Sequence, residues 1–241
     1  YRRRYQNINK LQNNIIIMYS PLLNKIDLLE PLIEATGKPA MMDKAKFLYD
    51  RISNPESYVV LLGETSCGKS SLINGLIGTQ LLPVKASPST AAISEIVFKH
   101  NCEKEEYFSI SKNAKMRLIS RQDFCIQCES PESNLARLRA HVNTENPLFN
   151  NLRVFDTPGY GAIVEEHEEI LKDFIPNSDV VIYMVSYKIG IQEYDYTFLS
   201  FLRELVRDDV KIVLVINRCP IGIHKDTDPR IKEIKSYVSD L

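Results

Sequence analysis

Four residues, Gly63, Gly68, Lys69 and Ser70, have the types and the spacing of a phosphate-binding loop. They fill the pattern G-x-x-x-x-G-K-S between the apolar run VVLL and a helical pattern that continues to about residue 77. Glycines let backbone N–H groups converge on phosphate oxygens, and the start of the following helix adds partial positive charge. The sequence therefore predicts a strand, a phosphate loop and a helix, in that order.

The side chains of this loop carry the predicted chemistry. Lys69 is expected to reach the β- and γ-phosphates of a nucleoside triphosphate, and the Ser70 hydroxyl is expected to ligate Mg²⁺. Cys67 is interpreted as a small residue in a tight turn, or as an oxidation-sensitive thiol, since helix N-termini lower thiol pKa values. The loop residues expected to contact the nucleotide are Gly63, Glu64, Thr65, Ser66, Cys67, Gly68, Lys69, Ser70 and Ser71.

Two later segments are expected to face this loop. The residues DTPG follow an apolar strand pattern, and their first residue, Asp156, can hold Mg²⁺ through water. Gly159 can donate its backbone N–H to the γ-phosphate and move when that group leaves. Thr90, in a Pro-rich loop before another strand pattern, is the candidate for a second hydroxyl ligand of Mg²⁺, with Ser89 as the alternative. Thr90 could instead simply begin the strand.

The last apolar strand pattern ends in NRCP, where a purine base would lie. A guanine-specific site is expected to have Asn-Lys-x-Asp or Asn-Arg-x-Asp here, because the aspartate accepts N–H groups that adenine lacks. Pro220 replaces that aspartate. Asn217 and the stem of Arg218 remain candidates to pack on a purine. Asp226 or Asp228, in the following loop, is a possible substitute for the absent carboxylate.

Alternating strands and helices are predicted to position these residues. Apolar runs predict strands at 59–62, 93–99, 106–111, 152–155, 180–185 and 210–216, and helical periodicity predicts helices from the loop to 77 and at 121–142, 163–175, 198–205 and 231–238. The continuous runs at 180–185 and 210–216 predict strands buried on both faces. The fold class is therefore α/β: a P-loop NTPase with a mostly parallel sheet, helices on both faces and an N-terminal helical segment.

The predicted domain boundary lies between residues 56 and 57. In residues 1–56, apolar side chains recur at helical spacing, with an interruption at Pro31 and an end at Gly37. Their apolar face needs a partner: the nucleotide-binding domain, helices of a longer protein or a second copy. Residues 57–241 are predicted to be the nucleotide-binding domain. Such a sheet normally adds another strand and helix, so we expect either that the domain is incomplete at its C-terminus or that those parts are reorganised.

Composition narrows the functional classes. The 241 residues are 44% hydrophobic, and the net charge of −1 argues against a mainly electrostatic nucleic-acid binder, so no nucleic-acid partner is expected. No apolar run approaches the ~20 residues of a membrane span, and the expected compartment is the cytosol.

Five cysteines predict free thiols, and the C-x-x-C pair Cys125 and Cys128 lacks the second ligand pair of a zinc site. The arginines between 117 and 139 could form a basic face, but scattered arginines are usually just exposed, and they are interpreted so: Arg117, Arg121, Arg137 and Arg139.

Five segments together resemble the GTPase domain of the dynamin-like superfamily, especially its bacterial-type and mitofusin-like branches. They are LLGETSCGKSSLINGLIG, PSTAAI, VFDTPG, HEEI and NRCP, and the resemblance covers about residues 57–240. It implies Mg²⁺-dependent GTP binding and hydrolysis by a large GTPase that dimerises through its nucleotide face and remodels or tethers membranes. It further implies a cytoplasmic protein peripheral to a membrane, with membrane contact through parts outside this chain and residues 1–56 in a neck bundle.

The same resemblance implies how the attacking water is placed. Members of the superfamily use a phosphate-loop residue and a monovalent cation, and Tyr160 stands here where Ras-like GTPases usually have glutamine. Ser66 falls where dynamins have a catalytic serine, so the expected catalytic residues are Ser66, Lys69 and Thr90. Thr65 departs from the glutamine common in dynamins, and the arginine finger of atlastin-like relatives is absent.

Two alternatives remain open at this level. Pro220 favours an ATP-using relative such as those of the EHD branch. Thr65 and Pro220 together favour a non-hydrolysing, nucleotide-gated interaction module, although Lys69, Ser70 and Asp156 are all present and argue for an active site.

Overall fold

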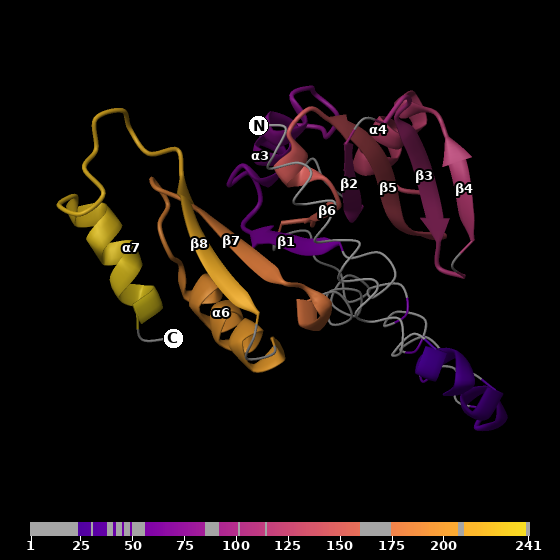
Figure 1. The fold of residues 1–241 in the computed structure, drawn as a ribbon. Helices are drawn as coiled ribbons and strands as arrows, with labels where there is room; N and C mark the ends of the chain where they lie inside the picture. The colour runs from indigo at the N-terminus through magenta and orange to yellow at the C-terminus, as the bar shows by residue number, and fades with distance from the viewer. Residues whose placement is uncertain are drawn as a thin grey trace, which may run out of the picture. The chain divides into compact units, whose positions relative to one another are not determined.

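The computed structural model describes residues 24–29, 31–37, 41, 45, 49, 56–84, 92–100, 102–113, 115–159, 175–206 and 210–239 (Figure 1). The chain divides into two units, Tyr1–Glu56 and Ser57–Leu241. The roles predicted for the two parts, a neck segment and a nucleotide-binding domain, stay predictions.

The described part of the first unit is helical at 24–29 and 31–35. The helix ends in a turn in which the Gly37 N–H donates to the carbonyl of Glu34 at 3.0 Å. Gly37 has a φ of +62°, which glycine adopts without steric cost. The predicted end at Gly37 is confirmed. Of the residues after Gly37 in this unit, where the sequence also predicts a short helix, the structure describes only 41, 45, 49 and 56.

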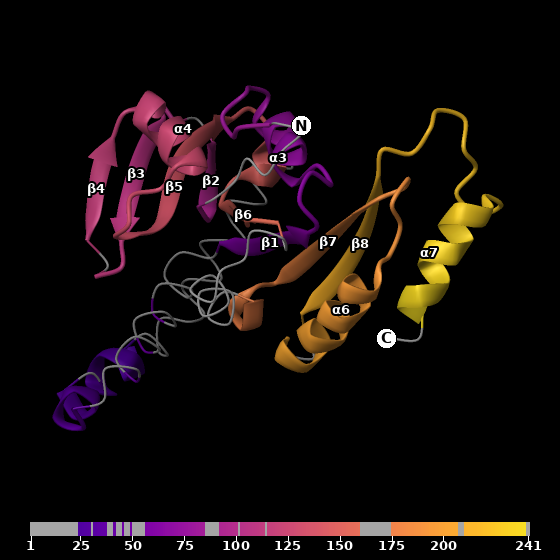
Figure 2. The same ribbon diagram turned by 180° about the vertical axis from the view of Figure 1, so that it is seen from behind.

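The second unit is built on one sheet of eight described strands in the order β4-β3-β5-β2-β6-β1-β7-β8 (Figures 1 and 2). The strands are β1 Ser57–Gly63, β2 Ser94–His100, β3 Glu106–Ser111, β4 Met116–Ile119, β5 Leu135–Thr144, β6 Leu152–Asp156, β7 Val180–Ser186 and β8 Lys211–Asn217. The pairs β6–β1, β1–β7, β7–β8 and β5–β2 are parallel. The predicted mostly parallel sheet is confirmed.

An antiparallel junction between β2 and β6 joins the two halves of this sheet. Across it Ser94 pairs with Asp156 and Glu95 pairs with Phe155. The carboxyl end of β6 therefore lies beside the amino end of β2, which is the point where the Pro-rich loop rejoins the sheet.

Helices cover both faces of the sheet. They are α3 Lys69–Ile77, α4 Arg121–Glu129, α6 Glu193–Leu205 and α7 Pro229–Ser239, with short 3₁₀ helices at Pro147–Phe149 and Ile175–Asn177. On one face, α3 and α4 pack on a core that includes Leu61, Phe98 and Leu138. On the other, α6 and α7 pack on a core that includes Val60 and Tyr183. Because neighbouring residues of β1 point to opposite faces, these two cores lie on either side of the sheet.

The predicted helix over 121–142 is wrong in its second half. Only Arg121–Glu129 is helical, and Leu135–Thr144 forms the strand β5. In β5 the buried residues Leu138, Ala140 and Val142 alternate with more exposed ones, which is the period of a strand. The short strand β4 was not predicted.

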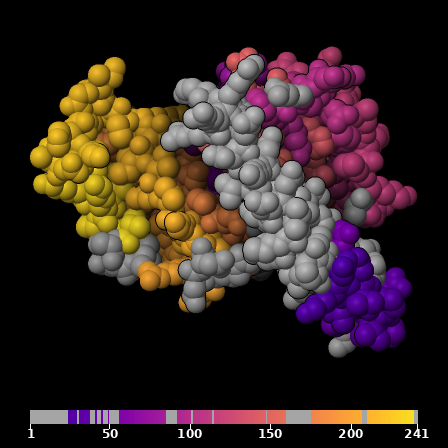
Figure 3. Space-filling model, viewed as in Figure 1, coloured from indigo at the N-terminus to yellow at the C-terminus, as the bar shows by residue number. Residues whose placement is uncertain are grey.

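The prediction that 210–216 is buried on both faces is also wrong. In the described sheet β8 is an edge strand, and Ile212 and Val213 are 37% and 42% exposed. In the space-filling view of Figure 3, the surface of the segment 210–239 is orange to yellow.

The acid-rich helix predicted at 163–175 lies outside the described residues except for Ile175. None of the described helices combines the length and the apolar character needed to cross a membrane.

Candidate nucleotide-binding site

The two glycines of the G-x-x-x-x-G-K-S pattern are required by the shape of the loop between β1 and α3. Gly63 and Gly68 have φ values of +138° and +109°. A Cβ on Gly63 would lie 2.2 Å from the backbone oxygen of Met184, and a Cβ on Gly68 would lie 2.3 Å from Nδ2 of Asn217. A side chain at either position would therefore clash and strain the backbone.

Lys69, the first residue of α3, folds back over this loop. Its ammonium donates to the carbonyl oxygens of Gly63 at 2.8 Å and Glu64 at 3.0 Å, and the residue is only 6% exposed. A third, longer contact joins the ammonium to Sγ of Cys67 at 4.0 Å, so each of these contacts of the ammonium is with the loop. The loop thus holds a buried positive charge beside the backbone amides that would surround a phosphate.

Two predicted magnesium ligands meet at the end of β6. The Ser70 hydroxyl donates to Oδ2 of Asp156 at 2.7 Å, and Asp156 is fully buried. The next residue, Thr157, donates to the carbonyl of Leu61 at 2.7 Å and ties this turn to β1. A hydroxyl and a carboxylate are oxygen donors of the kind that Mg²⁺ prefers, so the pair fits that ion. Their role as metal ligands stays a prediction, and Thr90 and Ser89 lie outside the described residues.

Gly159 packs directly on the phosphate loop. A Cβ on Gly159 would lie 2.3 Å from Oγ1 and 2.4 Å from the backbone N of Thr65. Within the described part of the chain, the Thr65 hydroxyl is buried and makes no hydrogen bond. The structure therefore brings the DTPG segment and the loop into contact, as their predicted common role requires.

The middle of the loop is strained and tightly packed. Ser66 has a φ of +62°, an uncommon conformation for a residue with a side chain. Cys67 is 1% exposed, and its burial raises the pKa of the thiol despite the opposing effect of Lys69. A buried, protonated thiol is unreactive, which favours the interpretation of Cys67 as a small residue in a tight turn.

One contact of the loop was missed from the sequence. Tyr194, near the start of α6, has its pKa raised by burial and by a hydrogen bond to the Glu64 side chain. The two residues are 130 positions apart, and no local pattern marks Tyr194 as a partner of the loop. Glu64 therefore joins the loop to α6.

Asn217, one of the two residues predicted to contact the base, is hydrogen-bonded to the phosphate loop. The Asn217 side chain donates from Nδ2 to the carbonyl of Cys67 at 2.9 Å and accepts at Oδ1 from the Arg218 N–H at 2.8 Å. Arg218 itself has a φ of +57°. Asn217 thus supports the loop, and its packing against a purine stays a prediction, as does that of Arg218.

Asp228 has a structural role at the start of α7. Its carboxylate accepts from the Tyr187 hydroxyl at 3.1 and 3.2 Å and from the Ile231 N–H at 3.0 Å. These bonds anchor the helix to the loop after β7. Asp226 is exposed and accepts no bond of this kind among the contacts of the described chain; its N–H contacts His224 at 3.4 Å.

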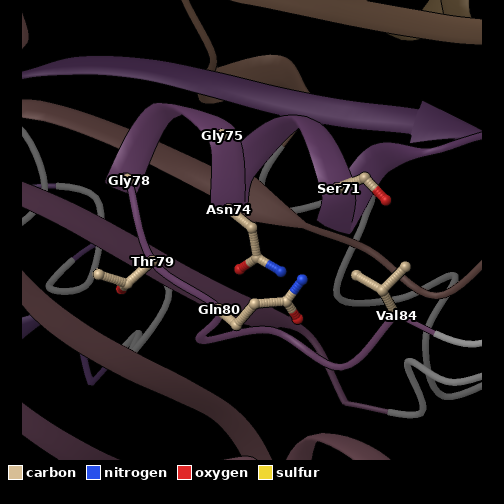
Figure 4. Close-up of a pocket in the computed structure, with 7 residues that line it drawn as sticks. All are labelled: Ser71, Asn74, Gly75, Gly78, Thr79, Gln80 and Val84. Atoms are coloured by element: carbon tan, nitrogen blue, oxygen red, sulfur yellow. The ribbon is translucent and has the colours of Figure 1, made fainter.

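The remaining candidate features lie apart from the loop. Burial raises the pKa of Cys128 to about 12, and its thiol contacts the Ser94 hydroxyl at 3.4 Å. In the described ranges, no three His, Cys, Asp or Glu side chains are grouped to hold a metal ion. A cavity of about 350 Å³ lies beside α3 (Figure 4). Ser71 lines it, whereas residues 63–70 do not, so this cavity is separate from the phosphate loop.

Comparisons with known proteins agree on one family. The model of the Dynamin family matches residues 59–219. An uncharacterized protein in the xynA 3' region of Caldicellulosiruptor sp. (strain Rt8B.4) is 23% identical over 226 residues, which cover 93% of this chain and 54% of that protein. A probable transmembrane GTPase, FZO-like and chloroplastic, from Arabidopsis thaliana is 24% identical over 88% of this chain and 20% of its own length.

Two further similarities concern bacterial proteins. Dynamin-like protein A of Bacillus subtilis is 23% identical over 79% of this chain and 15% of its own length. A solved structure of an oligomerised bacterial dynamin pair, described as a mechanism for long range sensing and tethering of membranes, has a TM-score of 0.57 at 15% identity. That similarity covers 90% of this chain and 37% of the other, and it shows the fold. The chain spans about half the length of the Caldicellulosiruptor relative and smaller shares of the others.

Proposed function

Because the chain belongs to the dynamin family, we propose that it binds GTP and hydrolyses it with Mg²⁺ at the loop between β1 and α3. The observation that carries this proposal is the 2.7 Å contact between Ser70 and Asp156, beside the buried ammonium of Lys69. A phosphate-binding loop, a lysine and two oxygen donors for a metal are the parts that phosphoryl transfer needs.

Each of these residues has a role in the proposed reaction. Lys69 and the loop amides bind the β- and γ-phosphates, while Ser70 and Asp156, together with Thr90, hold Mg²⁺. The bound ion would neutralise charge on the phosphate oxygens. Gly159 offers its backbone N–H to the γ-phosphate. Ser66 would orient the attacking water, and a monovalent cation, when bound, would supply further positive charge at the phosphates.

We further propose a nucleotide-dependent homodimer that works at a membrane surface in the cytoplasm. Support comes from the family and from the solved bacterial dynamin pair, which is described as oligomerised and as tethering membranes. Membrane contact would be made by parts outside this chain, with a neck role for Tyr1–Glu56 and nucleotide binding by Ser57–Leu241.

Calorimetric titration with GTP and Mg²⁺ tests the proposed site. Lys69→Ala is expected to abolish binding of the triphosphate, because the charge and two loop contacts are lost together. Lys235→Ala, on the exposed side of α7, is the matched control and should bind as the unmodified protein does. Equal GTP affinity in Lys69→Ala would refute the site.

A second candidate keeps the site and changes the base. Pro220 stands in place of the guanine-reading carboxylate, and Asp228 is occupied as the cap of α7. Both observations favour ATP. Competition of GTP and ATP for a fluorescent nucleotide decides between the two, since equal or better binding of ATP would overturn the choice of GTP. Single-turnover hydrolysis that rises with protein concentration would exclude a non-hydrolysing interaction module.

A further inference from the structure

A buried carboxylate on β2 is surrounded by three arginines. Glu95 is fully buried, and its Oε1 accepts from Arg153 of β6 at 2.5 Å. Its Oε2 accepts from Arg137 at 3.2 Å and lies 3.0 Å from Nε of Arg139, both on β5. The arginine side chains are 16% to 29% exposed, so Arg137 and Arg139 are not the freely exposed residues that the sequence analysis expected. Glu95 therefore links the strands on both of its sides.

Arg153 extends this linkage to β1. Its guanidinium lies 4.9 Å from the centre of the Tyr58 ring. Tyr58 is the residue of β1 that pairs with Arg153 of β6 in the sheet. The Tyr58 ring also stacks on Phe155, with the ring centres 6.0 Å apart. The contacts thus run without a break across β5, β2, β6 and β1. We call Glu95, Arg137, Arg139, Arg153 and Tyr58 the Glu95 network.

This network includes residues of β1 and β6, the two strands that end at the candidate site. β1 ends at Gly63, the first residue of the loop, and β6 ends at Asp156. Arg153 precedes Asp156 by three residues, about 10 Å along a strand. Glu95 also lies next to Ser94, which pairs with Asp156 across the antiparallel junction. The network therefore fixes the register of the strands whose ends carry the loop and the carboxylate.

We propose that Glu95 is a positioning residue for the proposed metal site, and that it acts by holding β6 in register so that Asp156 stays beside Ser70. This proposal rests on the proposed function. Burial by itself would raise the pKa of Glu95, but Arg153, Arg139 and Arg137 together lower it, so the carboxylate is charged when it binds them. Loss of that charge would leave three arginines without their shared partner and loosen β5, β2 and β6 at once.

Glu95→Gln tests the proposal, because it keeps the shape of the side chain and removes the charge. We expect the Mg²⁺ concentration that half-saturates binding of fluorescently labelled GTP to rise about tenfold. Binding of the same nucleotide in EDTA should change less than twofold. Electron paramagnetic resonance of Mn²⁺ added with nucleotide gives a second readout, independent of hydrolysis. A residue that only stabilises the fold would lower the melting temperature without changing the metal requirement.

The exposed pair of Arg117 and Glu132, 3.3 Å apart in the same half of the unit, provides the control. Glu132→Gln should leave the Mg²⁺ requirement unchanged. Arg153→Lys is the second test variant, since lysine keeps the charge but loses the planar contact with Tyr58. It should raise the Mg²⁺ requirement about threefold.

Each outcome of these measurements is decisive. A folded Glu95→Gln or Arg153→Lys protein with the unmodified Mg²⁺ requirement would overturn the proposal. Failure of both variants to fold would show that the network serves stability, and would overturn it as well. If the unmodified protein binds GTP without any response to Mg²⁺, the proposed function itself fails, which is a different result from unchanged variants of a Mg²⁺-dependent protein.

Discussion

Gly159 and Thr65 are packed so closely that a single added carbon atom would not fit between them. A Cβ on Gly159 would lie 2.3 Å from the Thr65 hydroxyl and 2.5 Å from its Cα. This contact joins the segment after β6 to the phosphate loop, so any shift of one must be accommodated by the other.

Replacement of Gly159 by alanine should therefore displace the loop. We expect Gly159→Ala to weaken GTP binding and to lower the free energy of unfolding by about 1–3 kcal/mol, the usual cost of overpacking. Urea unfolding and calorimetry measure the two effects. Gly75→Ala is the control, because Gly75 lies inside α3 with open space around it. It should stabilise the helix by about 1 kcal/mol. Unchanged binding and stability in Gly159→Ala would contradict the packing.

The Asn74 side chain of α3 forms hydrogen bonds with the backbone of the segment that follows the helix. Its Oδ1 accepts from the Leu81 and Leu82 N–H groups at 3.0 and 2.9 Å, and its Nδ2 donates to the Leu82 carbonyl at 2.8 Å. The residue is drawn in Figure 4. Asn74→Ala should lower the free energy of unfolding by about 3 kcal/mol, roughly 1 for each lost bond. Gln80→Ala, at an exposed neighbouring position, should change it by less than about 0.5 kcal/mol in the same urea titration.

The Glu95 network predicts a pH dependence of stability. Arginine contacts hold the pKa of Glu95 below its ordinary value in the folded state. The unfolded chain therefore takes up the proton first as the pH falls, starting near the ordinary value of about 4.3. The stabilisation is present above that pH and is lost as the pH falls through the lower, folded-state value.

Unfolding free energies of the unmodified protein and Glu95→Gln, measured between pH 7 and pH 3, check this sign. The difference between them should be largest near neutral pH and should shrink in acid. A difference that grows as the pH falls would contradict the direction of the shift.

Asn217 should act on nucleotide binding through the phosphate loop. The amide of Asn217 donates to the carbonyl of Cys67. We therefore expect Asn217→Ala to lower the affinities for GTP and for ATP by a similar factor, roughly fivefold for one hydrogen bond. Competition with a fluorescent nucleotide measures both affinities. Asp228→Asn, which alters the cap of α7, should leave the ratio of GTP to ATP affinity unchanged. A loss confined to GTP in Asn217→Ala would instead assign this side chain to reading of the base.

The parts of the fold that were predicted correctly are those set by local pattern. Apolar runs ending in Gly63 and Asp156 identified β1 and β6, and the glycine, lysine and serine spacing located the loop. β5 was mistaken for a helix because its leucines also fit a helical spacing, while its alternation of Arg137, Leu138 and Arg139 was read as charge on a solvated surface.

The contacts that the sequence could not reveal join residues far apart in the chain. Glu95 binds Arg137 and Arg153, which lie 42 and 58 positions away, and Asn217 bonds to Cys67 across 150 positions. Such pairs become neighbours only through the order of strands in the sheet. No helix or strand period connects them, so propensity and spacing give no sign of them.

The place of β1 in the sheet also determines when the proposed site can be assembled during synthesis. Both neighbours of β1, β6 and β7, are made after it, and the partner of Ser70 follows 86 positions later. A nascent chain that has just produced the loop has neither the carboxylate nor the flanking strands that hold the loop in shape. The contact between Ser70 and Asp156 can therefore form only after Asp156 has been synthesised, and nucleotide bound at the complete proposed site would stabilise the domain only from that stage onward.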